Sequence, residues 1–133
     1  MRSRRAVQAA LIGLLCLLAA WAVAEGPTVT PLLGKDLAGL PGKEGVMLTV
    51  EYAPGASSSK HRHNAHTFVY VLEGSVVMQV AGGDAVTLGP GQTFYESPED
   101  IHSVSKNASD SHPAKFLVFF VKEKGAPPVV PVQ

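Results

Sequence analysis

The chain has 133 residues, including 11 lysine and arginine residues, 11 acidic residues and five histidines, and its formal net charge at pH 7 is zero. This length is enough for one compact domain with a single core. The sequence has no basic patch, which argues against a nucleic-acid partner.

The first segment in chain order has the pattern of a secretory signal peptide. Three arginines within the first five residues precede an uncharged apolar run from residue 6 to 23, and Ala22-Val23-Ala24 supplies the small residues of a cleavage site. We therefore expect residues 1–24 to be removed and the mature protein to be periplasmic or secreted. The alternative is a retained membrane anchor, because the run approaches the roughly 18 to 20 residues that a spanning helix needs.

Cleavage would also remove the single cysteine, Cys16, and would leave eight basic residues against 11 acidic ones. The mature chain would then have neither disulfides nor thiolate ligands, so that any metal would be bound by imidazole and carboxylate. Ser3-Arg4-Arg5 resembles the start of a twin-arginine signal. The export route is therefore open between the general secretory and the twin-arginine systems.

Residues 25–44 are rich in Gly, Pro and Leu, and predict a lead-in segment that lies against the domain or against a second subunit. From residue 45 to 124 the sequence consists of short β-branched and aromatic runs between Gly- and Pro-rich turns, which is typical of strands. The predicted strands span residues 46–51, 67–73, 75–81, 85–88, 92–96, 102–106 and 115–121. Gly74 separates two of them and predicts a hairpin there.

Seven or so short strands, with no helical period outside the signal, predict an all-β sandwich or barrel. The tail, residues 125–133, has too many prolines for a central strand. We therefore expect it to form an extended arm on the surface or at an oligomer edge.

The strongest candidate for a functional site is a set of three histidines. His61 and His63 are two residues apart on an extended segment, so both side chains point to the same face, and a neighbouring strand can supply His102. This pattern indicates a divalent transition metal, and imidazole ligands leave iron, manganese, nickel, copper and zinc all open. The alternative is that these histidines are polar residues at the mouth of a barrel that binds no metal.

At this point the sequence resembles the cupin superfamily. The first family motif is matched by Gly55, His61, His63 and Gly74, and the second more loosely by Gly91, Pro98, His102 and Asn107. The resemblance implies a double-stranded β-helix, or jelly-roll, barrel over nearly the whole mature chain. It also implies that the three histidines are metal ligands.

The chain departs from the family at one ligand position. Thr67 stands seven residues before Gly74, where the family carries a metal-binding glutamate, and a threonine hydroxyl is a poor ligand. A fourth ligand could come from Glu96 or from His66, although His66 needs a bulge because alternation places it on the opposite face. Alternatively, Glu96 hydrogen-bonds to the neighbouring turn or orients a ligand histidine.

An open three-histidine site favours a small anionic, chelating ligand such as an enolate, a carboxylate or a catechol-like oxygen pair. Similar three-histidine cupins include oxygenases that cleave diketones or oxidise thiols. The resemblance thus implies a small dioxygenase-like enzyme, with Glu96 or Tyr95 available for proton transfer. The alternative is a non-catalytic module that binds a small ligand or the metal itself. The resemblance also implies a homodimer formed through sheet edges or terminal arms.

Overall fold

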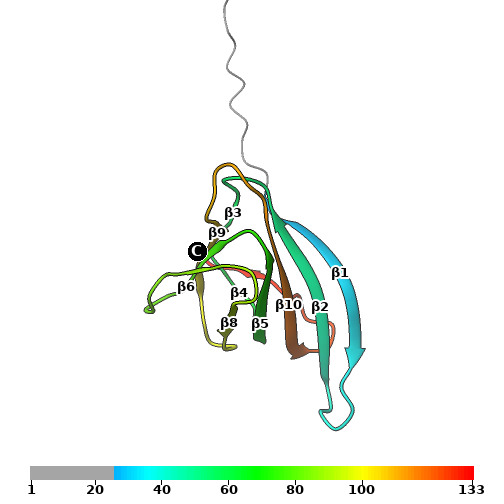
Figure 1. Cartoon of the computed structure of the whole chain (residues 1–133). Coiled ribbons are helices and arrows are strands. Elements are labelled where there is room, and N and C mark those ends of the chain that lie inside the picture. The colour runs from blue at the N-terminus through cyan, green and yellow to red at the C-terminus, as the bar shows by residue number, and fades with distance from the viewer. Residues whose placement is uncertain (1–25) are drawn as a thin grey trace, which may run out of the picture.

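The computed structural model describes residues 26–133, and the predicted signal peptide, residues 1–24, lies outside the described residues. All regular structure from residue 26 onward is β-strand, in two antiparallel sheets (Figure 1), which confirms the all-β prediction. No helix that could cross a membrane is present among these residues.

The two sheets are built from strands that are distant in the sequence. The first sheet has the order β1 (Thr28–Asp36), β2 (Lys43–Tyr52), β10 (Ala114–Glu123), β5 (His66–Glu73) and β8 (Thr93–Glu96). The second has the order β11 (Val130–Pro131), β4 (His61–Arg62), β9 (His102–Asn107), β6 (Val76–Val80) and β7 (Val86–Leu88), and β3 (Ser57–Ser58) also pairs with β9. The long strands β1, β2 and β10 form one side of the molecule in Figure 1.

Strand β10 shows how the sequence builds the core. Its residues alternate between buried and half-buried, so that Phe116, Val118 and Phe120 face inward. Successive side chains of a strand point to opposite faces, so the apolar run over residues 116–121 presents apolar side chains on both faces. The inward side chains join those of β2, β5 and β6 in one apolar cluster between the sheets.

The predicted hairpin at Gly74 is wrong, because β5 and β6 belong to different sheets. Gly74 has a φ of 68°, and a Cβ at this position would lie 2.3 Å from the carbonyl oxygen of Pro113. Only glycine fits such a backbone conformation at so close an approach. Gly74 is thus a tight corner at which the chain passes from one sheet to the other.

The lead-in contains a strand that its sequence did not predict. Residues 28–36 form β1, which pairs antiparallel with β2 from Thr28 opposite Glu51 to Asp36 opposite Glu44, with a register shift after Pro31. All nine residues of β1 are exposed, so the apolar alternation that marks a strand in the sequence is missing. The lead-in lies against the domain as the edge strand of the first sheet.

Strand β9 contains an irregularity that decides which of its side chains face inward. Val80 of β6 is opposite His102, whereas Gln79, the residue immediately before Val80, is opposite Val104. The extra residue, Ser103, forms a β-bulge, and its hydroxyl donates to the carbonyl of Gln79 at 3.1 Å. Because the bulge shifts the alternation, His102 and Ser105 are both buried although they are three residues apart.

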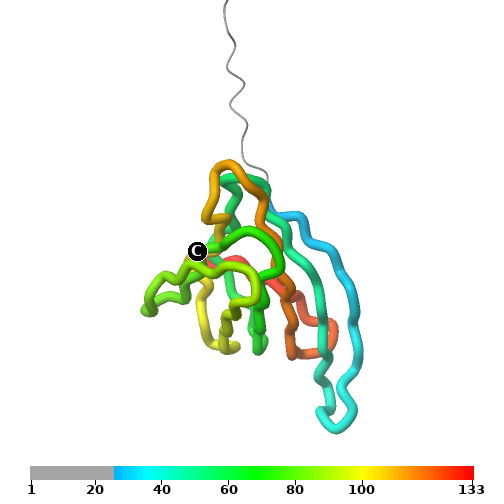
Figure 2. The backbone as a smooth tube through the Cα atoms, in the orientation of Figure 1, coloured from blue at the N-terminus to red at the C-terminus, as the bar shows by residue number. Residues whose placement is uncertain are grey.

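The C-terminal segment does not project from the domain. It leaves β10 and crosses to the second sheet (red in Figure 2), where Val130 and Pro131 pair with Arg62 and His61 of β4. The backbone amide of Val132 also donates to the carbonyl of Lys60 at 3.4 Å. The tail therefore covers the strand that carries the first histidine.

Candidate metal centre

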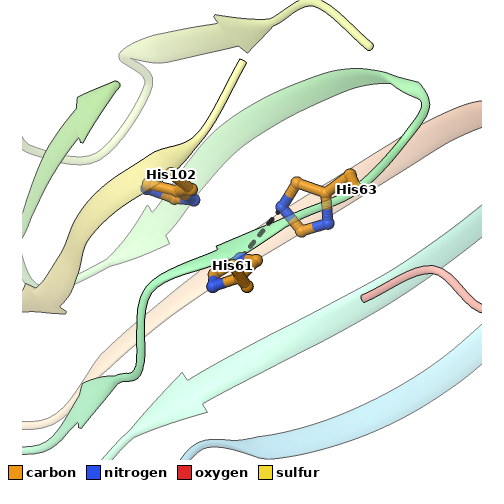
Figure 3. Close-up of side chains that lie close together, drawn as sticks. All are labelled: His61, His63 and His102. Atoms are coloured by element: carbon orange, nitrogen blue, oxygen red, sulfur yellow. Dashed lines mark hydrogen bonds between the residues drawn. The ribbon is translucent and has the colours of Figure 1, made fainter. Parts of the chain in front are cut away.

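Three elements bring the histidines together. His61 lies on β4 directly opposite His102 on β9, and His63 follows β4 by one residue. All three side chains are buried, and one nitrogen of each lies within 4.8 Å of the others. Figure 3 shows the imidazole rings turned toward a common point. The structure thus forms the cluster expected from the sequence, with a geometry that can hold a metal ion.

The backbone fixes the tautomer of two of these histidines. The Nδ1–H of His61 donates to the carbonyl of Ser59 at 2.7 Å, and the Nδ1–H of His63 donates to the carbonyl of Pro128 at 2.8 Å. A neutral imidazole carries only one proton, so Nε2 of each ring is left with a lone pair. These lone pairs are the groups that bind a metal, and carbonyl partners of this kind are typical of ligand histidines.

The two Nε2 atoms lie 3.1 Å apart, within hydrogen-bond distance (dashed in Figure 3). A hydrogen bond there would require a second proton on one ring, and burial lowers the pKa of His63 to about 4, which opposes that proton. Two nitrogens bound at about 2.1 Å to one ion, with their bonds at a right angle, would stand about 3.0 Å apart. The pair therefore fits a shared cation better than it fits a hydrogen bond.

Glu96 extends from β8 toward the same histidines. Its Oε1 lies 3.2 Å from Nδ1 of His102 and 3.7 Å from Nε2 of His63, and its side chain is almost completely buried. The two carboxylate oxygens of Glu96 and the two ring nitrogens of His102 have no well-formed hydrogen bond to any other group in residues 26–133. Buried polar groups are nearly always paired, so four unpartnered atoms in one place point to a bound ion.

Burial shifts the protonation of the metal-free site toward its neutral form. It raises the pKa of Glu96 to about 8, with a smaller contribution from the nearby Asp100 carboxylate. It lowers the pKa of His102 to about 3, with further contributions from His61 and His63. These directions follow from the cost of placing a charge in an apolar interior without a counter-ion.

The histidines open into a cavity of about 390 Å³ between the two sheets. Most of its wall is apolar and comes from Leu48, Val50, Val69, Phe116, Val118 and Phe120. The tail adds Pro128, Val129 and Pro131, which the sequence alone had not associated with the site. No signal in the tail sequence marks this role, because it depends on where the chain is placed after β10.

A cluster of hydroxyl groups forms a second polar region of the cavity wall. The Tyr52 hydroxyl is within hydrogen-bond distance of Ser58 Oγ (2.5 Å) and of Ser105 Oγ (2.8 Å). All three residues line the cavity, and Tyr52 is almost completely buried. Two hydrogen bonds use two of the three O–H donors, so one donor remains for a ligand. Sequence reasoning missed this cluster because the β9 bulge is needed to turn Ser105 inward.

Two residues considered for the site lie elsewhere. Tyr95 is 47% exposed on the outer face of β8, and its hydroxyl is 2.7 Å from Nδ1 of His66, which is also exposed. Strand alternation explains this, because Tyr95 precedes the inward-facing Glu96 and His66 precedes the inward-facing Thr67. The structure therefore places Tyr95 and His66 on the face of the sheet opposite the three histidines, and a role of Tyr95 in proton transfer stays a prediction.

Comparison with known proteins shows which family and which solved structures this chain is similar to. Residues 48–120 match the family described as "Cupin domain". A protein with a double-stranded β-helix domain from Klebsiella pneumoniae has a similar fold (TM-score 0.63, 16% identity, 80% of this chain and 86% of that one). The polyketide cyclase RemF from Streptomyces resistomycificus matches with a TM-score of 0.61 and 26% identity over 83% of this chain and 73% of its own.

An oxalate oxidase in complex with the substrate analogue glycolate is also similar, with a TM-score of 0.60 and 24% identity. The match covers 79% of this chain but only 54% of the oxalate oxidase. No match was found among curated proteins. The structural similarities confirm the double-stranded β-helix fold expected from the sequence.

Proposed function

The chain belongs to the cupin family, and we propose that it is an exported, metal-dependent enzyme of the oxygenase type that acts on a small chelating substrate. The metal is one divalent transition ion bound by His61, His63 and His102. The observation that carries this proposal is the convergence of three buried imidazoles, two of them with Nε2 left free by backbone carbonyls, at the wall of a cavity large enough for a small molecule.

The composition of the cavity wall supports a particular substrate class. Its lining is mainly apolar, and its one cationic side chain, Lys60, is exposed. A substrate with a separate carboxylate on its body would find no buried counter-charge there. We therefore favour a molecule with an apolar body and two adjacent oxygens that chelate as an enolate, such as a 1,3-diketone. The similarity to a polyketide cyclase is in keeping with such a carbonyl-bearing substrate.

A bound divalent ion would supply Lewis acidity toward the substrate oxygens and redox chemistry with O₂. The protein contributes positioning and exclusion of water. Phe120 packs against His63 with ring centroids 4.9 Å apart, and Phe94 stacks on His102 at 6.0 Å. These aromatic contacts and the apolar wall hold the ligand rings in place and lower the local dielectric constant, which strengthens electrostatic interactions with a bound substrate.

The first test is the metal content of the mature protein purified without added metal, followed by titration of the metal-free protein with Fe²⁺, Mn²⁺, Ni²⁺, Cu²⁺ and Zn²⁺. We expect one ion per chain, and His61→Ala and His102→Ala should each abolish tight binding. His112→Ala removes an exposed histidine in a loop and is the matched control. Equal metal content in the His61→Ala variant and the parent would overturn the ligand assignment.

The second test is O₂ uptake by the metal-loaded protein with a panel of 1,3-diketones, thiols and catechols. Uptake that depends on His61 supports the oxygenase. Metal-loaded protein that binds these compounds but consumes neither them nor O₂ would overturn the enzymatic proposal and favour a binding module. Conversion of a substrate without O₂ uptake would replace the oxygenase with a non-oxidative metal enzyme.

A further inference from the structure

We propose that Glu96 is a fourth protein ligand of the metal, beside the three histidines. The inference rests on the metal site of the proposed function and adds to it the residue that supplies negative charge. A carboxylate ligand compensates part of the double positive charge of the ion, which three neutral imidazoles leave unchanged.

The position of Glu96 follows from the register of two adjacent strands. Glu96 on β8 is directly opposite Thr67 on β5, and both side chains are almost completely buried on the inner face. Both also line the cavity that the histidines open into. Directly opposite residues have their Cβ atoms only about 5 Å apart, so the two positions give access to nearly the same space.

The surroundings of Glu96 lack what a buried carboxyl group otherwise needs. Its two oxygens have no hydrogen-bond partner among residues 26–133, and no lysine or arginine in that range forms an ion pair with it. The nearest polar atoms are nitrogens of His102 and His63, which are also candidate ligands. A buried carboxylate without a partner is costly, and a cation at this point would bind the carboxylate and the imidazoles together.

The distances from Glu96 to two of the three histidines are close to those expected for a shared ion, whereas the group whose ligand atoms all lie within 4.8 Å of one another is formed by the histidines alone. The separations of 3.2 Å from Glu96 to His102 and 3.7 Å from Glu96 to His63 are close to the 3.1 Å between the Nε2 atoms of His61 and His63. Ligand atoms of one transition-metal ion stand at separations of about 3.0 to 3.5 Å when each bond is about 2.1 Å long. His102 differs from the other two histidines in that neither of its nitrogens makes a well-formed hydrogen bond, although Oε1 of Glu96 and the backbone of Val104 lie near the ring.

The proposal predicts that the carboxylate can be moved between the two strands. Glu96→Gln keeps the shape of the side chain but removes the charge. We expect it to weaken binding of Ni²⁺ or Co²⁺ to the metal-free protein by about 100-fold or more, since even groups that only orient a ligand contribute about 10- to 100-fold. Adding Thr67→Glu to this variant places a carboxylate on the opposite strand, and affinity should return to within about tenfold of the parent.

Glu99→Gln is the matched control, because it makes the same change of charge three residues away on the surface. Affinity should stay at the parental value in this variant. Circular dichroism of each metal-free variant checks that it is folded, and the visible absorption of the Co²⁺ forms gives a readout of the ligand set that does not depend on turnover. If the Thr67→Glu double variant does not fold, Glu96→Asp replaces it, with an intermediate affinity expected because the shorter carboxylate keeps its charge.

The outcomes separate this inference from the proposed function. Parental affinity and an unchanged Co²⁺ spectrum in Glu96→Gln, together with lost binding in His61→Ala, would overturn Glu96 as a ligand and leave the three-histidine site intact. Parental affinity in both variants would overturn the metal site itself. A large loss in Glu96→Gln that Thr67→Glu restores would establish that the carboxylate, and not the fold around it, is what the metal requires.

Discussion

The two faces of the first sheet are built from the same strands but differ in burial: the inner face packs against the second sheet, and the outer face is exposed. On β5, Thr67, Val69 and Val71 are buried on the inner face, whereas Phe68, Tyr70 and Leu72 on the outer face are 40 to 48% exposed. Tyr95 on β8 extends this exposed aromatic surface. The comparison teaches that apolar character does not locate the functional face of this sheet. The candidate functional face is instead marked by the enclosed cavity and by the buried polar atoms of Glu96 and His102 that lack hydrogen-bond partners.

The largest difference between the faces is expected in stability. Phe120→Ala, on the inner face of β10, should lower the free energy of unfolding by about 3 kcal/mol, because it removes a buried ring that packs on His63. Phe68→Ala, on the outer face, should cost less than about 1 kcal/mol, since that ring is already half in water. Denaturant unfolding of the metal-free proteins measures both. Similar losses would mean that the outer face is packed against another chain.

Removal of the C-terminal tail is expected to weaken metal binding, which depends on the inner face of the sheet. A chain that ends at Ala126 lacks the Pro128 carbonyl that fixes the His63 tautomer and the tail residues of the cavity wall. We expect metal affinity to fall by about 10- to 100-fold, as for other groups that orient a ligand histidine. A chain that lacks only residues 132–133 keeps β11 and serves as the control. Unchanged affinity after the longer truncation would show that the tail covers the cavity without orienting His63.

The pH dependence of the metal-free protein should also report on the inner face. Folded Glu96 holds its proton up to about pH 8 against a usual pKa of 4.5, so the folded state binds more protons between these values and stability falls as pH rises. His63 and His102, with pKa values lowered to about 4 and 3 from 6.5, act in the opposite sense below pH 6.5.

Stability of the metal-free protein should therefore be greatest near pH 6.5 and should fall by about 2 kcal/mol between pH 6.5 and 8, where only Glu96 among these three groups still titrates. Chemical denaturation across this range measures the effect. In Glu96→Gln the decline above pH 6.5 should disappear. A decline of the same size in that variant would assign it to another group.

The smallest effect is expected at Tyr95. Because its hydroxyl faces away from the cavity, Tyr95→Phe should change metal affinity and any turnover by no more than about twofold, as is usual for a surface substitution. Parallel metal titration and activity measurements on this variant and its parent test the point. A large loss of turnover with unchanged metal affinity would mean that the outer face takes part in the reaction.

Local sequence pattern predicted much of this molecule. The spacing of His61 and His63 is a local property of an extended chain, and the alternating, turn-separated strands from residue 45 to 124 gave the fold class. Prediction failed where a position depends on distant chain segments. Gly74 became a corner between sheets because the carbonyl of Pro113 approaches it, and the fully exposed β1 had no buried face to mark it as a strand.

By itself, the sequence determined the β-strand character of this protein, two of its three histidines as a pair, and the absence of a carboxylate at Thr67. Only the tertiary structure decided that Glu96 stands opposite Thr67, that the β9 bulge turns both His102 and Ser105 inward, and that the tail supplies a carbonyl to His63. The physical reason is that local chain geometry sets the direction of neighbouring side chains. Strand register and packing between distant segments set which of those side chains meet.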